Sequence, residues 1–181
     1  YGSGVVREWR EAKKEARTSR LTQKGLRLLT EGEFDRARKF LDGAGEDSDA
    51  RGINFLSAAK AANNQGDHQA RETYLRRAVE TDPSLSRAAI VLSAELALRR
   101  KDPAAALIAL DSIKLNGYAA ELKLQALKMS GDWRASMVAL PGLRKLLDTE
   151  PFENEIALIG LKAEAGNDTE LNALFTSLGA S

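Results

Sequence analysis

Histidine and cysteine, the side chains that most often ligate metals or form nucleophile–base pairs, are almost missing from this chain. His68 is the single histidine among 181 residues, and cysteine is absent. Multi-histidine metal sites, histidine-centred triads, disulfides and thiolate sites are therefore excluded. His68 also lies in a short turn that recurs along the chain, as described below. Other copies of this turn carry Phe, Pro or Trp at the same position, so we expect a packing or turn role for His68.

Carboxylates and glycines offer the remaining material for chemistry. Glu46-Asp47-Ser48-Asp49 is a run of acids, but it lacks the calcium-loop pattern with a central glycine and a final glutamate. Gly43-Ala44-Gly45 is followed by acids and not by the Lys-Ser/Thr of a phosphate loop. No Glu or Asp pair stands out as an acid/base couple. We therefore predict no enzyme activity, no metal and no cofactor.

Charge is balanced overall but not locally. The chain has 27 basic and 26 acidic residues, which argues against a nucleic-acid binder. Between Arg7 and Arg27, however, eight basic residues accompany three acidic ones. No apolar run approaches the roughly 20 residues that span a bilayer. The basic segment is either a membrane-surface contact or a solvated charged helix.

A turn recurs along the chain at intervals of 34, 35, 30 and 35 residues. Each copy separates two stretches with helical apolar spacing, and no segment shows the period-two alternation of strands. The copies are Gly32-Glu33-Phe34, Gly66-Asp67-His68, Lys101-Asp102-Pro103, Gly131-Asp132-Trp133 and Gly166-Asn167-Asp168. A period near 34 is typical of tetratricopeptide hairpins, which must stack to bury their apolar faces.

The predicted fold is an all-α, right-handed superhelix (α-solenoid) of about five tetratricopeptide (TPR)-like hairpins in a single domain, 1–181. A generic helical bundle is the alternative. The repeats are expected at about 18–50, 51–84, 85–116, 117–147 and 152–181, with 1–20 as a projecting basic helix start. The helix pairs are expected at 5–30 with 34–44, 50–65 with 68–81, 85–100 with 104–114, 118–130 with 133–147, and 152–165 with 169–178.

Small residues at matching steps support the repeats, with Arg71 and Ser136 standing where alanine is usual. Pro141 lies inside a predicted helix and should kink or break it.

Several strings resemble the proteobacterial HemY family. Ile53–Ala62 resembles its LNYLAAARAA stretch, and Glu31–Arg38 is similar to the turn and helix before it. Leu92–Leu98 resembles the TQAELQL helix, and Gly131-Asp132-Trp133 with Leu140–Lys145 resembles GDW…LPxLRK. Together the matches cover about 6–145.

This resemblance implies the soluble region of a bacterial inner-membrane protein linked to late haem biosynthesis, with two membrane helices before it. A basic helix following a membrane span favours the cytoplasmic side and attracts anionic lipid. The family's association with haem also suggests an alternative function, a carrier of haem or porphyrin. Its donors would be His68, Tyr74, Tyr118, Met129 or Met137, although no local motif marks a pocket.

In a tetratricopeptide stack the first helix of each hairpin lines the concave face. Transferring its inward steps predicts a mixed polar groove for an extended peptide or a partner helix. The residues are Lys60, Asn63, Asn64, Val91, Glu95, Leu98, Arg99, Glu121, Gln125, Lys128 and Met129. We expect a noncatalytic protein-interaction scaffold whose partners include haem-synthesis enzymes. The alternatives are an adaptor unrelated to haem, or the haem or porphyrin carrier.

Overall fold

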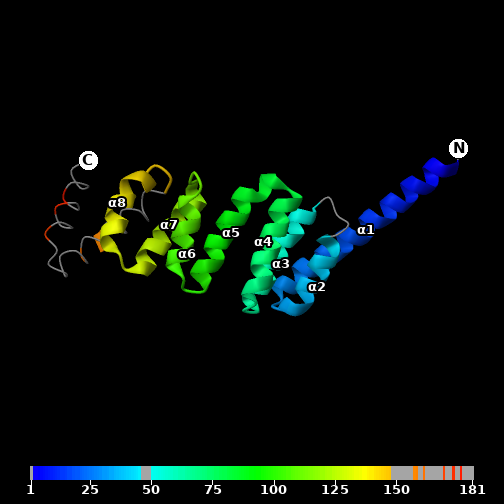
Figure 1. Ribbon diagram of the computed structural model, residues 1–181, viewed down its shortest axis with the longest axis horizontal. Coiled ribbons are helices and arrows are strands. Elements are labelled where there is room, and N and C mark those ends of the chain that lie inside the picture. The colour runs from blue at the N-terminus through cyan, green and yellow to red at the C-terminus, as the bar shows by residue number, and fades with distance from the viewer. Residues whose placement is uncertain are drawn as a thin grey trace. The chain divides into compact units, whose positions relative to one another are not determined.

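The computed structural model describes residues 2–45 and 50–147, together with the single positions 157, 158, 161, 169, 173 and 176. Within these residues all regular secondary structure is helical (Figure 1), which confirms the all-α prediction. The predicted fifth hairpin, at 152–181, lies outside the described residues apart from those single positions.

Eight α-helices and one short 3-10 helix follow one another along the described ranges. They are α1 (Gly2–Thr30), α2 (Phe34–Gly45), α3 (Arg51–Asn64), α4 (His68–Thr81), η1 (Pro83–Leu85), α5 (Ser86–Arg99), α6 (Pro103–Asp111), α7 (Gly117–Ser130) and α8 (Trp133–Leu143). Most bounds lie close to the predicted ones. The predicted helix 104–114 ends earlier, at Asp111, where the Ser112 hydroxyl donates to the Ala109 carbonyl at 2.7 Å.

The recurring turn has the backbone conformation that its sequence predicts. Gly32, Gly66 and Gly131 have φ of 81°, 75° and 70°, in the left-handed region that glycine enters without a steric penalty. Lys101 occupies the same position with φ 62° despite its side chain. The aspartate after three of these residues caps the next helix by accepting from a backbone N–H: Asp67 from Ala70, Asp102 from Ala105 and Asp132 from Ala135.

The chain divides into two compact units, Tyr1–Leu92 and Ser93–Ser181. In the first, α1 packs on α2, α2 on α3, and α3 on α4, as consecutive antiparallel helices (Figure 1). In the second, α6 packs on α7 and α7 on α8 in the same manner. The antiparallel hairpins are thus present in each unit, while the superhelix and the single-domain organisation remain predictions.

The core of the first unit lies where its helices approach one another closely. Leu28 of α1, Leu41 of α2 and Phe55 of α3 are almost completely buried. At Gly25 the approach is closest, because a Cβ added there would lie 2.6 Å from Cγ of Leu41. Glycine and alanine at these steps therefore let the helix backbones come together, as the repeat pattern predicts.

Arg71 and Ser136, which depart from the small-residue pattern, are both buried and both hydrogen-bonded. The Arg71 guanidinium donates to Glu72 at 2.6 Å and to the Asn63 amide oxygen at 3.3 Å. The Ser136 hydroxyl donates to the Asp132 carbonyl at 2.8 Å. Each polar group is thereby satisfied inside the hairpin, which removes most of the cost of burying it.

The second unit has an apolar cluster between α7 and α8, made of Ala120, Leu124, Met137, Leu140 and Leu143. α8 continues through Pro141 and ends shortly after it, at Leu143, although 147 was expected. The break predicted inside this segment therefore falls just after the proline, which removes a backbone N–H from the helix.

Candidate interaction sites

The first half of α1 receives no cover from the rest of its unit in the described residues. Every side chain from 4 to 17 is exposed, with Val5 at 67% and Trp9 at 61%. Burial begins at Thr18, and Gly25 and Leu28 then face α2. The helix is thus anchored by its second half while its first half presents all its faces.

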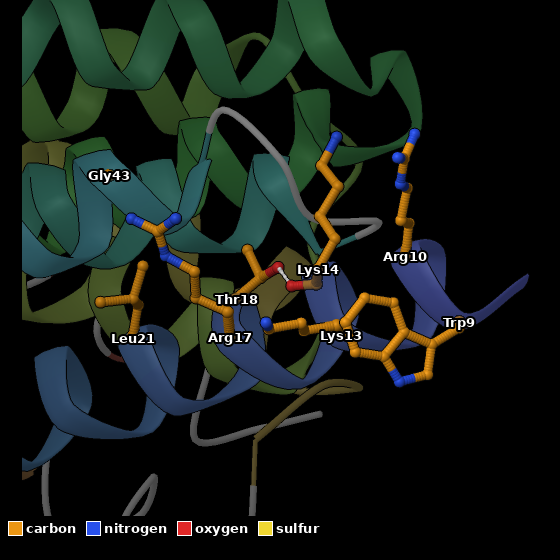
Figure 2. Close-up of a pocket in the computed structure, with 8 residues that line it drawn as sticks. All are labelled: Trp9, Arg10, Lys13, Lys14, Arg17, Thr18, Leu21 and Gly43. Atoms are coloured by element: carbon orange, nitrogen blue, oxygen red, sulfur yellow. Dashed lines mark hydrogen bonds between the residues drawn. The ribbon is translucent and has the colours of Figure 1, made fainter. Parts of the chain in front are cut away.

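A hollow of about 520 Å³ lies beside this first half of α1 (Figure 2). Its described lining residues are Trp9, Arg10, Lys13, Lys14, Arg17, Thr18, Leu21 and Gly43. Four of them are basic and none of them is acidic. The Lys13 ammonium lies 4.9 Å from the centre of the Trp9 ring, a cation–π distance. The hollow is therefore suited to an anionic group.

The groove residues predicted in the first unit differ in accessibility. Asn64 is exposed, and Lys60 and Val91 are half-buried. Asn63 is only 8% exposed and accepts a hydrogen bond from buried Arg71. Its side chain belongs to the packing of the α3–α4 hairpin, so among the predicted residues of α3 only Lys60 and Asn64 can be reached by a partner.

In the second unit the structure joins two of the predicted residues in a polar cluster. Arg99 donates to one carboxylate oxygen of Glu95 at 2.8 Å, and the Tyr118 hydroxyl donates to the other at 3.2 Å. Burial, and then the Glu95 charge, raise the pKa of Tyr118 above its ordinary value. Leu98, the other predicted residue of α5 in this unit, is 5% exposed and packs inside.

The remaining predicted residues follow one face of α7. Glu121 and Gln125 are exposed, Lys128 is half-buried, and Met129 is 38% exposed. Tyr118 continues this face by its i, i+3 and i, i+7 spacing to Glu121 and Gln125. We call Glu95, Arg99, Tyr118, Glu121, Gln125 and Met129 the α5–α7 surface. Sequence reasoning missed Tyr118 here, although its spacing was the signal that would have found it.

The five candidate haem donors are dispersed. His68 is exposed beside Arg71, and Tyr74 is buried and stacks on Phe55 with ring centres 6.2 Å apart. Tyr118 and Met129 lie on α7, whereas Met137 is buried in α8. Among the described residues no group of three or more His, Cys, Asp or Glu is arranged to hold a metal ion.

Residues 2–66, which contain α1, α2 and α3, match the family model for the HemY protein N-terminus. This part of the chain is similar to the N-terminus of HemY proteins. The HemY resemblance is therefore confirmed over this region, which carries the basic hollow of α1 and the α3 positions Lys60 and Asn64. No curated protein and no solved structure matches the chain. In the part of the chain that the structure describes, none of the helices has the length and apolarity to cross a membrane.

Proposed function

We propose that the chain is a noncatalytic protein-interaction scaffold, the part outside the membrane of a HemY-like inner-membrane protein that serves late haem biosynthesis. The observation that carries this proposal is the HemY match over α1–α3 in a chain built from consecutive antiparallel helices. Helical hairpins of this kind bury one face against the next pair and leave another face for a ligand.

The α5–α7 surface has the composition of a binding surface. It combines an aromatic ring, a guanidinium, two carboxylates, an amide and an exposed methionine on neighbouring positions. Tyr118 and Arg99 are of the residue types that most often dominate binding energy. Glu95 holds both of them in place, so they lose little conformational freedom when a partner binds. The ligand that fits is an extended peptide or the polar face of a helix.

The test is binding of purified haem-synthesis enzymes to the chain and to a double variant, Glu121→Lys with Gln125→Lys. These side chains are exposed, so the variant should keep its fold while reversing the charge of the α5–α7 surface. We expect one of the enzymes to bind the wild-type chain and the double variant to weaken that binding at least about tenfold.

Ile108→Lys is the matched control, because Ile108 is 76% exposed on α6, the second helix of its hairpin, and also gains a charge. Binding should be unchanged in this variant. Equal loss in both variants would remove the α5–α7 surface from the proposal. Absence of binding to every haem-synthesis enzyme would refute the link to haem.

The basic hollow favours a second contact, with anionic lipid at the cytoplasmic face of a bacterial inner membrane. Arg10 and Arg17 lie in it with Trp9, a residue that prefers the membrane interface. Arg10→Glu with Arg17→Glu should abolish flotation with anionic vesicles at low salt, whereas Arg87→Glu, at an exposed position of α5, should not. A wild-type chain that ignores anionic vesicles would dispose of this contact.

A further inference from the structure

The exposed first half of α1 carries an apolar stripe that faces away from α2. Val5, Trp9, Ala12 and Ala16 follow one another at steps of four, three and four residues, which is the a/d spacing of a coiled coil. All four are exposed. The α1 residues that bury against the unit, such as Thr18, Gly25 and Leu28, lie on the other side of the helix at about 100° per residue.

Charged residues flank this stripe with one sign on each side. In heptad terms, with Val5 at d and Trp9 at a, the g positions are Glu8 and Glu15. The e positions, which follow the d positions Ala12 and Ser19, are Lys13 and Arg20. All four charged side chains are exposed. No ion pair among the described residues involves any of them, although Lys13 lies over the Trp9 ring.

This arrangement selects one partner and one orientation. In a parallel pair of helices each g residue faces the e residue five positions later on the other helix. Two copies of α1 in parallel therefore oppose Glu8 to Lys13 and Glu15 to Arg20, twice each. An antiparallel pair would oppose acid to acid and base to base, which is repulsive. From this charge complementarity we infer that α1 docks on α1 of a second copy of this chain as a parallel dimer.

The rest of the helix limits and supports this contact. Thr22 and Leu29, the next g positions, are half-buried in their own unit, so the seam covers the first half of α1. The second half of α1 is held helical by its packing on α2. The first half therefore continues an existing helix, and its pairing with a second copy needs no new helix nucleus. Arg10 and Arg17 of the basic hollow lie outside the seam, whereas Trp9 and Lys13, which also line the hollow, are part of it.

Charge reversal tests the pairing. The double variants Glu8→Lys with Glu15→Lys, and Lys13→Glu with Arg20→Glu, should each self-associate at least about tenfold more weakly than wild type. An equimolar mixture of the two should dimerise like wild type, because every pair is attractive again. Sedimentation velocity over a range of concentrations measures this. A wild-type chain that stays monomeric throughout, or a mixture that does not associate, overturns the dimer.

Orientation is tested by disulfide formation, because the wild-type chain has no cysteine. Ala12→Cys places two d-position thiols side by side in a parallel dimer, whereas Arg10→Cys, at an outer position, keeps them apart. Oxidation should link the Ala12→Cys chains and leave the Arg10→Cys chains unlinked. Equal disulfide linkage of the Ala12→Cys and Arg10→Cys chains would contradict the inference. So would a chain that is monomeric and whose charge variants change only vesicle binding.

Discussion

Replacing Gly25 by alanine should destabilise the chain even though alanine is the better helix former. Gly25 lies inside α1, where glycine costs about 1 kcal/mol relative to alanine. The added Cβ, however, would lie 2.6 Å from Cγ and 2.9 Å from Cδ2 of Leu41. Carbon atoms pack at about 3.5–4.0 Å, so Leu41 or the two helices must move by about 1 Å.

Leu41 has little room to move. Its side chain is completely buried, its backbone nitrogen also lies 3.2 Å from the added atom, and the clashing Cγ is a branch point near the backbone. Overpacking of this kind costs about 1–3 kcal/mol or more. Subtracting the gain in helix propensity leaves a net loss of up to about 2 kcal/mol in the free energy of unfolding.

Gly43→Ala is the matched control, since Gly43 lies inside α2 and an added Cβ would meet nothing within 4 Å. This variant should be more stable than wild type by up to about 1 kcal/mol. Urea unfolding, followed by circular dichroism in the helix band (~222 nm), measures the free energy of unfolding of both variants. If Gly25→Ala is as stable as Gly43→Ala, α1 and α2 do not approach as closely as the structure shows and the reasoning is refuted.

Asn54→Leu should raise the free energy of unfolding by about 1–3 kcal/mol, because Asn54 is 1% exposed and neither atom of its amide has a hydrogen-bond partner in the described part of the chain. Thermal or urea unfolding measures this, and a less stable variant would mean that the amide is satisfied. Leu140→Ala should lower the same quantity by about 2–5 kcal/mol, because Leu140 is completely buried in the α7–α8 cluster; Val138→Ala, at an exposed site on α8, should change little. The pKa of Asp67 is lowered by the backbone N–H at the start of α4 and then by Arg38, so its ionised form stabilises the fold above about pH 4 and this stabilisation is lost as the pH falls through the lowered pKa. Asp67→Asn keeps a capping oxygen but cannot ionise, so its stability deficit at neutral pH should shrink in acid; a deficit independent of pH in urea unfolding would contradict this.

The helix boundaries and turns were predictable because local chemistry determines them. The left-handed residue and the capping aspartate are neighbours in sequence, as at Gly66 and Asp67, so no distant contact is needed to recognise them. Lys101 shows that this rule tolerates a non-glycine residue when the aspartate and proline after it are in place. Propensity and capping together were sufficient for these elements.

The accessible faces were harder to predict, because rotation about a helix axis depends on tertiary packing. Glu95 and Arg99 are one full turn apart and share a face, whereas Leu98 is turned toward the interior with Ala94 and Ala97. Asn63 is buried because Arg71, eight residues later, occupies the hairpin and requires an acceptor. Such a pairing between helices leaves no periodic signal in the sequence.

The length of α1 sets a distance between its exposed first half and the part of the helix that packs on α2. Gly25 follows Trp9 by sixteen residue steps along α1, a rise of about 24 Å at 1.5 Å per residue. A molecule held on the apolar stripe at Trp9 therefore lies well away from Gly25, where α1 comes closest to α2, although the hollow beside Trp9 also reaches Gly43 of α2. Occupancy at one end need not obstruct occupancy at Lys60 or Asn64 on α3, so one copy of the chain can hold two different molecules at a fixed spacing and act as a molecular ruler.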